Sequence, residues 1–455
     1  MAERSPNPSA VDPSGMNRRQ VLGSMAGLTG AALLAACGSS SKTAAPTTAA
    51  TTAAPATTAA TTTTAAATTT TAAATTTTAA ATTTTAAAGG GKATGTLTWG
   101  SNYSDAKDKA GIQATADAFP NKNVQVKINT VDHNTYQDNI STYLQQPDDI
   151  ISWFAGYRLR FFAAKGLVGD ISDIWKDASG FSDAFKSAST GDDGKQYLVP
   201  FYYYPWAVHY RKSFFAQKGY TIPKTWDEFM ALMEKMKKDG VTPLAAANDG
   251  KWPQMGMFDQ LNMRTNGFQF HVDLMAGKGD WTSPEVAKVF TTWKSILPYY
   301  QDGVNGRTWQ NAANDWAANK TGMYLLGTFV TSNFKDQAII DDIDFFPFPS
   351  IDPKNAQDAV EAPIDGFMMA AKPKNPDAAK EFLAYMATAP AEEAYLKVNP
   401  SSIAANSKAN TADYTALQKS RSSWSAGRST SRSSSTATRT RSSHPTWPAP
   451  ASPTS

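Results

Sequence analysis

The sequence contains few of the residues that carry covalent, metal or redox chemistry. Cys37 is the only cysteine among 455 residues, so no disulfide can form within the chain. The four histidines are widely separated without metal-ligand spacing, and no Gly-x-Ser-x-Gly or phosphate-binding glycine motif occurs. We therefore expect no catalytic residues, no metal site and no cofactor.

Charge is also sparse and unpatterned. The net charge is only +3 and no basic stripe occurs, so the sequence predicts no nucleic-acid partner. Adjacent carboxylates occur at Asp148-Asp149, Asp192-Asp193 and Asp341-Asp342. Neighbouring side chains on a strand point to opposite faces, so these pairs are poorly placed for acid–base catalysis. We expect them in solvated loops.

The apolar run near the N-terminus, residues 21–36, is shorter than the roughly 20 residues that cross a bilayer as a helix. Arg18-Arg19 precedes it and Leu34-Ala35-Ala36 ends it, which is typical of an export signal. A cysteine directly after Leu-Ala-Ala resembles the bacterial lipobox, in which the thiol receives a diacylglycerol and the peptide is cut just before it.

We therefore expect residues 1–36 to be a signal peptide and Cys37 to be lipidated. The lipid would anchor the protein on the extracellular face of the cytoplasmic membrane. The paired arginines favour the twin-arginine export route and leave the general secretory route open.

Residues 37–92 contain the predicted lipidation site and then a tract without charge. Residues 44–91 are almost wholly Ala and Thr, and Thr-Thr-Thr-Thr-Ala-Ala-Ala repeats four times in residues 61–88. The seven-residue period does not predict a coiled coil, because no large apolar residue forms a seam. Such a tract predicts a disordered tether with a span on the order of 40 Å. Its dense threonine resembles O-glycosylated stalks, and the sequence leaves glycosylation open.

Residues 93–419 are aromatic-rich and long enough for a substantial core. Strand patterns alternate with helical ones, which predicts an α/β architecture with mainly parallel sheets. Helix starts are predicted at Thr225, Ser283 and Asn375, each followed by an apolar helical stripe. Trp226 and Trp293 follow such stripes, so we assign both to the core.

Five sequence motifs occur in a familiar order. Together with the lipobox and tether, they resemble the extracellular solute-binding proteins of carbohydrate ABC importers, the maltose-binding-like group, over about residues 95–419. The motifs are PDDIISWFAGYRLRFFAAKGLVGDIS, YLVPFYYYPWAVHYRKSFF, GYTIPKTWDEFM, TGMYLLGTF and GFMMAAKPKNPDAAKEFLAYM.

The resemblance implies a two-lobed, periplasmic-binding-protein-like (type II) fold in which crossovers join discontinuous lobes and hinge closure encloses a ligand. We expect crossovers near Tyr204, at residues 343–349 and near Asp365. The first lobe would then comprise about residues 93–205 and 347–364. The second would comprise about residues 206–346 and 365–419.

A pyranose presents an apolar C–H face and a ring of hydroxyls, which aromatic rings and convergent polar groups recognise respectively. The family often has an acidic residue where this chain has Gly156-Tyr157-Arg158, and a tryptophan where it has Phe329. The predicted ligand-binding residues are Trp153, Tyr157, Arg158, Trp206, Trp252, Phe329, Asp365 and Gly366.

From residue 420 the chain becomes rich in Ser, Arg, Thr and Pro, which predicts a disordered tail over residues 420–455. Regrouping the codons by one base permits Ala-Val-Glu-Leu-Val-Gly-Gly in place of residues 421–427. Our hypothesis is that this tail is a frameshift product, which sequencing of the coding DNA would test.

The sequence thus predicts a monomeric, lipid-anchored receptor that captures a sugar or oligosaccharide for an ABC permease with a separate ATPase. Two alternatives stay open. A cell-surface polysaccharide-degrading enzyme would need two carboxylates facing one cleft. A ligand-binding module of a sensory system would need only closure on its ligand.

Overall fold

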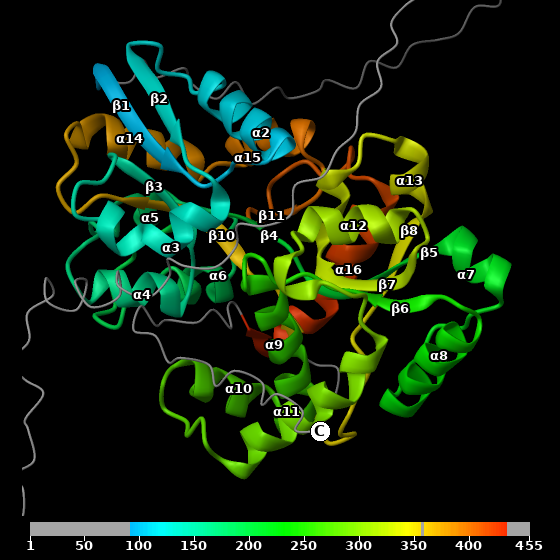
Figure 1. The fold of residues 1–455 in the computed structure, drawn as a ribbon. Helices are drawn as coiled ribbons and strands as arrows, with labels where there is room; N and C mark the ends of the chain where they lie inside the picture. Colours follow the sequence, from blue (N-terminus) through cyan, green and yellow to red (C-terminus); the bar gives the residue numbers. More distant parts are fainter. Residues whose placement is uncertain (1–91, 356–358, 435–455) are drawn as a thin grey trace, which may run out of the picture. The chain divides into compact units, whose positions relative to one another are not determined.

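The computed structural model describes residues 92–355 and 359–434 (Figure 1). The predicted signal peptide, the lipidation site Cys37 and almost all of the tether lie outside the described residues, as does the tail beyond residue 434. Contacts divide the chain into Met1–Thr83 and Thr84–Ser455. The fold below is that of the second unit.

The first sheet has six strands in the order β11-β4-β10-β3-β1-β2. Apolar side chains cover both of its faces, and successive residues such as Phe367 and Met368 enter different cores. Its strands are β1 (Gly95–Ser101), β2 (Val124–Thr130), β3 (Ile150–Phe154), β4 (Val199–Tyr203), β10 (Ile364–Met369) and β11 (Ile403–Ala404).

The second sheet has four strands in the order β6-β7-β5-β8, and one large core containing Phe229, Met233 and Trp316 packs around it. Its strands are β5 (Trp206–Arg211), β6 (Thr242–Ala245), β7 (Thr321–Gly327) and β8 (Ile343–Phe346). Two short strands, β9 (Val360–Glu361) and β12 (Ser433–Ser434), pair with each other in parallel.

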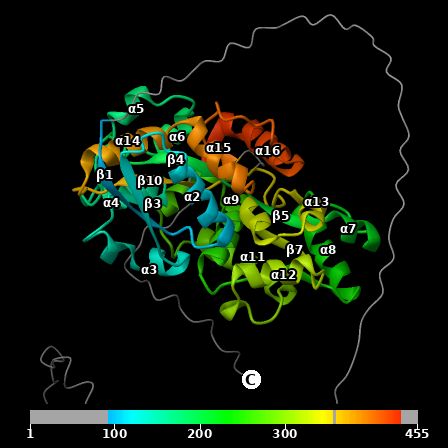
Figure 2. The same cartoon turned by 90° about the horizontal axis from the view of Figure 1, so that it is seen from above.

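Helices flank both sheets. Helices α2, α14 and α15 lie together against the first sheet (Figures 1 and 2). The α-helices are α2 (Ala106–Asp117), α3 (His133–Tyr143), α4 (Tyr157–Ala163), α5 (Ile174–Asp177), α6 (Asp183–Ala188), α7 (Lys212–Lys218), α8 (Trp226–Lys238), α9 (Trp252–Asn266), α10 (Phe268–Met275), α11 (Pro284–Ile296), α12 (Trp309–Ala317), α13 (Gln337–Asp342), α14 (Pro376–Met386), α15 (Ala389–Val398) and α16 (Ala416–Arg432). The 3₁₀ turns are η2 (Leu297–Tyr299), η3 (Val304–Gly306) and η4 (Thr328–Asn333).

The three predicted helix starts are confirmed. Thr225 and Glu228 form a reciprocal capping box at the start of α8. Ser283 caps α11 by accepting from the Val286 amide, and Asn375 caps α14 by accepting from the Ala378 amide. Local hydrogen bonding alone fixes these positions, which is why the sequence was sufficient to find them.

The prediction of mainly parallel sheets is wrong. Strands β1–β2, β1–β3 and β6–β7 pair in parallel, but β10 runs antiparallel to β3 and β4, and β5 runs antiparallel to β7 and β8. The physical reason is that the chain moves between the two sheets. It leaves the first sheet at the end of β4 and re-enters that sheet at the start of β10, so these two neighbouring strands run in opposite directions.

The lobe boundaries also need correction. The chain passes from β4 to β5 through Tyr204 and Pro205, close to where the first crossover was expected. Asp365, however, lies within β10 in the middle of the first sheet, so it marks no crossover. Residues 364–404 therefore pack with the first lobe. The chain returns to this lobe between β8 and β10, and it leaves the lobe again between β11 and α16.

The expectation of disorder from residue 420 is contradicted by helix α16, which extends to Arg432. Arg421 is 1% exposed and donates from Nη1 to the Thr328 carbonyl at 3.0 Å, and Trp424 packs on Phe345. Tertiary contacts with the second lobe hold this segment, although its Ser- and Arg-rich composition carries almost no apolar signal. The frameshift hypothesis stays a prediction.

Asp149 also departs from expectation. It is 1% exposed rather than solvated, and its carboxylate accepts from the amides of Thr98 and Asn375. Burial alone would raise the pKa of Asp149, but these hydrogen bonds outweigh it and lower that pKa. The carboxylate thereby joins β1 to the start of α14.

Among the described residues, no helix is both long and apolar enough to cross a membrane.

Candidate ligand-binding cleft

A cavity of about 1190 Å³ lies between the two sheets and is lined by residues of both. Five of the eight predicted ligand-binding residues line it, and no local sequence feature links them. They are Arg158, Trp206, Trp252, Phe329 and Asp365.

Trp153, Tyr157 and Gly366 do not line the cavity. Trp153 is 3% exposed within the core behind β3, and the guanidinium carbon of Arg158 lies 4.4 Å from its ring centroid. Tyr157 begins α4, and Arg160 lies over its ring. A Cβ at Gly366 would meet the Val199 carbonyl at 2.2 Å, so this glycine permits close approach of β10 to β4.

Four rings from the second lobe form what we call the aromatic wall, consisting of Trp206, Trp252, Trp309 and Phe329. Trp252 lies 6.2 Å from Trp206 and 5.7 Å from Phe329, and Trp309 lies 5.3 Å from Phe329. The interplanar angles are 90°, 60° and 90°, so edge-to-face packing holds each ring in place. Phe329 reaches the wall from η4, directly after β7, rather than from the strand itself.

Polar groups of the first lobe form the opposite side, the polar floor, consisting of His133, Gln137, Arg158, Tyr202 and Asp365. The Asp365 carboxylate accepts from the Tyr202 hydroxyl at 3.1 Å and from the Tyr204 hydroxyl at 2.9 Å. Burial raises the pKa of Asp365 to about 7; the tyrosine hydrogen bonds oppose this shift and nearby Asp108 reinforces it. Asp365 therefore titrates near neutral pH.

A hydrogen-bond chain fixes the rest of the polar floor. Arg158 donates from Nη2 to Gln137 Oε1 at 2.7 Å, and the Gln137 amide lies 2.6 Å from His133 Nε2. Because an amide NH₂ can only donate, His133 Nε2 accepts from Gln137 and the ring is neutral; Nδ1 lies 3.3 Å from both the carbonyl oxygen and the side-chain nitrogen of Asn102. Burial lowers the pKa of His133, which favours this neutral form.

Several cavity-lining groups were missed by sequence reasoning. Asp108 accepts from Tyr395 and Asn399, each at 2.6 Å, and burial raises its pKa to about 6. Tyr103 and His133 also line the cavity. All follow the carboxyl ends of β1 or β2, where open α/β sheets bind ligands, so applying that rule to the first two strands would have indicated this region.

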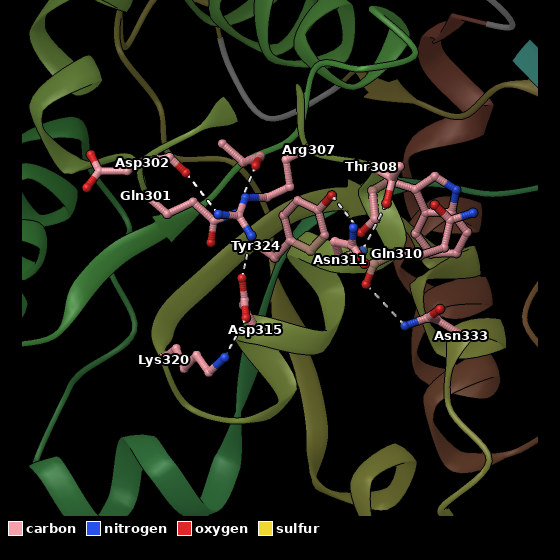
Figure 3. A network of polar contacts seen from close by, with 12 residues as sticks. Gln301, Asp302, Arg307, Thr308, Gln310, Asn311, Asp315, Lys320, Tyr324 and Asn333 are labelled. Atoms are coloured by element: carbon pink, nitrogen blue, oxygen red, sulfur yellow. Dashed lines mark hydrogen bonds and ion pairs between the residues drawn. The ribbon is translucent and has the colours of Figure 1, made fainter. Parts of the chain in front are cut away.

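A polar network supports the loop that carries Gln301 and Asp302 into the cavity lining (Figure 3). Arg307 forms an ion pair with Asp315 at 2.5 Å and donates to the Asp302 carbonyl at 2.9 Å. Lys320 adds a second cation to Asp315 at 2.9 Å. The loop is therefore fixed to α12 before any ligand arrives.

Buried polar atoms in the cavity lining have no hydrogen-bond partner among the described residues. They are Trp206 Nε1 and Gln301 Oε1. Buried polar groups are almost always satisfied in native proteins, so unmatched atoms in a cavity are places where a ligand or water would bind. One donor and one acceptor suit a ligand with hydroxyl groups, which both donate and accept.

The two lobes already touch at the cleft rim. Trp252 Nε1 donates to Asn134 Oδ1 at 3.2 Å, and Gln310 donates to Asp105 Oδ1 at 3.0 Å. Lys107 donates to the Phe334 carbonyl at 2.7 Å. Contacts of this kind are the ones that closure of two lobes over a ligand would make.

Within residues 92–355 and 359–434, no group of three or more His, Cys, Asp or Glu side chains could hold a metal ion. The site consists of rings, carboxylates and amides, which bind by stacking and hydrogen bonding.

The two lobes and the cleft between them define a receptor of the periplasmic-binding-protein type. Residues 103–393, well over half of the chain, match the model of the bacterial extracellular solute-binding proteins. The chain belongs to this family of binding proteins and is a receptor rather than an enzyme.

Known relatives agree with this assignment. An uncharacterized ABC transporter extracellular-binding protein of Pyrococcus horikoshii is 26% identical over 314 residues, 63% of this chain and 67% of that protein. A multiple sugar-binding protein of Streptococcus mutans is 29% identical over 46% of this chain and 51% of its own length. The alignments with these relatives thus span about half to two thirds of their lengths.

Among solved structures, the bacterial solute receptor AcbH is 44% identical and has a TM-score of 0.70. The match covers 75% of this chain and 87% of AcbH, which is described as having an exclusive preference for β-D-galactopyranose.

Proposed function

We propose that this protein is the substrate-binding lipoprotein of a carbohydrate ABC importer. The observation that carries the proposal is the two-sided cleft, in which an aromatic wall faces a carboxylate held by two tyrosines. Rings cover the apolar face of a pyranose, while Asp365 and Arg158 bind its hydroxyls. The family membership and the sugar-binding relatives support the same function.

The 44% identity to AcbH makes galactopyranose the first sugar to test. In our proposal the sugar contacts Arg158, Trp206, Trp252, Phe329 and Asp365 directly. Trp153 and Gly366 act behind the cleft by positioning Arg158 and β10 respectively.

Lipidation of Cys37 would anchor the receptor outside the membrane, with residues 37–92 as its tether. Ligand binding stabilises the closed arrangement because the two lobes contact the sugar from opposite sides. A permease pair driven by a separate ATPase would then recognise the closed receptor as a monomer.

The test is a thermal-shift panel of neutral monosaccharides and oligosaccharides on the full chain, with analysis of products over time. We expect a saturable rise in melting temperature for one sugar class and no product. A well-folded protein that responds to no carbohydrate would contradict the proposal, and so would turnover of any sugar. For the anchor, Cys37→Ser should move the exported protein from the membrane fraction to the soluble fraction.

A further inference from the structure

We propose that Lys251 is a positioning residue whose backbone becomes strained only when the two lobes close, and that this strain limits how tightly the receptor holds its sugar. Lys251 lies in the segment Gly250-Lys251-Trp252, which we call the rim turn. All three residues line the cavity. The inference rests on the proposed function and concerns the regulation of that same site.

The backbone of Lys251 is the first observation. Lys251 has a φ of 63° and a ψ of −40°, and the Trp252 amide donates to the Gly250 carbonyl at 2.7 Å. This is the geometry of a classic γ-turn, which is rare and strained for a residue with a Cβ. In the described part of the chain, Asn319 is the only other non-glycine residue with a positive φ. Strained backbone persists where its surroundings enforce it, and it gathers at ligand-binding sites.

The contacts of the rim turn with the first lobe are the second observation. Trp252 Nε1 donates to Asn134 Oδ1 at 3.2 Å, and the Trp252 ring packs edge-to-face on His133 with centroids 6.2 Å apart. A Cβ on Gly250 would lie 2.7 Å from Asn134 Oδ1, so the Gly250 backbone approaches α3 closely. The rim turn thus meets α3 of the opposite lobe at both of its ends, and these contacts exist only while the lobes are together.

The second lobe holds the residues that precede the rim turn. The amides of Asn248 and Asp249 donate to the Arg307 carbonyl at 3.2 and 3.1 Å. The Lys251 amide donates to the Asn248 carbonyl at 3.0 Å, and α9 begins at Trp252 directly after it. Lys251 is therefore the link between a held loop and the tryptophan that α3 engages. When the lobes separate, α3 no longer holds Trp252, and Lys251 can return to the negative φ that a residue with a Cβ favours.

The side chain of Lys251 contributes little to this arrangement. Its ammonium lies 3.9 Å from Asp138 Oδ2, and the two side chains are 67% and 68% exposed. An exposed ion pair of this length adds little to closure. A substitution at this position therefore acts mainly through the backbone, because glycine adopts a positive φ without the clash of a Cβ.

The experiment compares Lys251→Gly with Lys251→Ala. Both variants lack the ammonium and they differ only in the Cβ, so the difference between them measures the strain. Each full-length protein is titrated calorimetrically with galactose and the other sugars of the thermal-shift panel, and release is followed by stopped-flow tryptophan fluorescence. Asn319→Gly is the matched control, because Asn319 also has a positive φ, of 58°, but is not part of the cavity lining.

We expect Lys251→Gly to bind its sugar about three- to tenfold more tightly than Lys251→Ala, through slower release and without a higher melting temperature of the ligand-free protein. Asn319→Gly should bind sugar like the wild type. Equal affinities of the two Lys251 variants would overturn this inference alone. A higher melting temperature of ligand-free Lys251→Gly would also overturn it, because the strain would then be present before closure. Absence of binding by the wild type to every sugar of the panel would instead overturn the proposed function.

Discussion

The first-lobe side of the cleft presents Asp365, Arg158 and His133, whereas the second-lobe side presents Trp206, Trp252 and Phe329. Directed hydrogen bonds hold the polar floor in place, as with the two tyrosine hydroxyls on Asp365. Ring packing holds the aromatic wall. We expect high affinity to require both lobes, because the buried carboxylate and guanidinium lie on the first-lobe side and the tryptophan rings lie on the second-lobe side. On this proposal, ligand binding is coupled to closure of the cleft.

The largest expected effect comes from removing the carboxylate of the polar floor. Asp365→Ala should weaken sugar binding by about a hundredfold or more, because buried tyrosine hydroxyls and ligand hydroxyls both lose their acceptor. Isothermal calorimetry measures this change. Asp138→Asn, at the exposed rim of the same cavity, is the control and should bind almost normally. Affinity within about threefold of wild type for Asp365→Ala would show that the floor does not bind the ligand.

Truncating the aromatic wall should have a smaller effect. Trp252→Ala should weaken binding by about tenfold to a hundredfold through loss of stacking, together with its rim contact to Asn134. Trp226→Ala is the matched control, since Trp226 is a partly buried ring in the same core but lies outside the cavity lining. It should lower the melting temperature without changing affinity. Equal affinity losses in the two variants would indicate a general loss of structure.

The titration of Asp365 predicts a pH effect on stability. Its pKa is about 7 in the folded protein and about 3.9 when unfolded, so the folded state holds a proton that the unfolded state has released. Its contribution to the free energy of unfolding is therefore fully present below about pH 4, declines as pH rises, and is lost above about pH 7. The whole change is at most about 4 kcal/mol.

Melting curves of the wild type and Asp365→Asn between about pH 4 and 8 measure this contribution. The variant should lose less stability than the wild type as pH rises across this interval. If the melting temperatures of the two proteins changed with pH in the same way, the pKa of Asp365 would not be raised in the folded protein. The polar floor would then be more hydrated than its contacts indicate.

The smallest effect on binding is expected behind the wall. Arg421 donates to the Thr328 carbonyl, one residue before Phe329, and its Nη2 lies 3.3 Å from His209 Nδ1. No ion pair with a carboxylate is found for it among the described side chains. Burial lowers the pKa of Arg421 to about 9. Arg421→Met should raise the free energy of unfolding by about 1–3 kcal/mol and change sugar affinity by less than about twofold. A lower melting temperature would show that the contacts to Thr328 and His209 outweigh the cost of burying the charge.

The fold class and several local features could be predicted from the sequence. Caps at Thr225, Ser283 and Asn375 depend on neighbours within a few residues, so their local pattern suffices. Of the predicted residues that line the cavity, Arg158, Trp206, Phe329 and Asp365 followed from the family resemblance, and Trp252 was chosen only as an aromatic ring. Asp108 and Gln301 were not predicted, because what sets them apart from other polar residues is their burial, which the sequence alone does not show.

The sequence by itself determined the alternation of strands and helices, the helix starts and the abundance of rings and carboxylates. The motifs that predict a signal peptide, a lipobox and a tether lie almost wholly outside the described residues, so these three assignments stay predictions. Tertiary structure decided that β10 lies antiparallel between β3 and β4 and that residues 416–432 form helix α16. It also decided that Trp281 and Trp293 line the cavity, although the helical stripe had assigned Trp293 to the core. These depend on contacts between segments far apart in the chain, where burial and pairing override composition and local propensity.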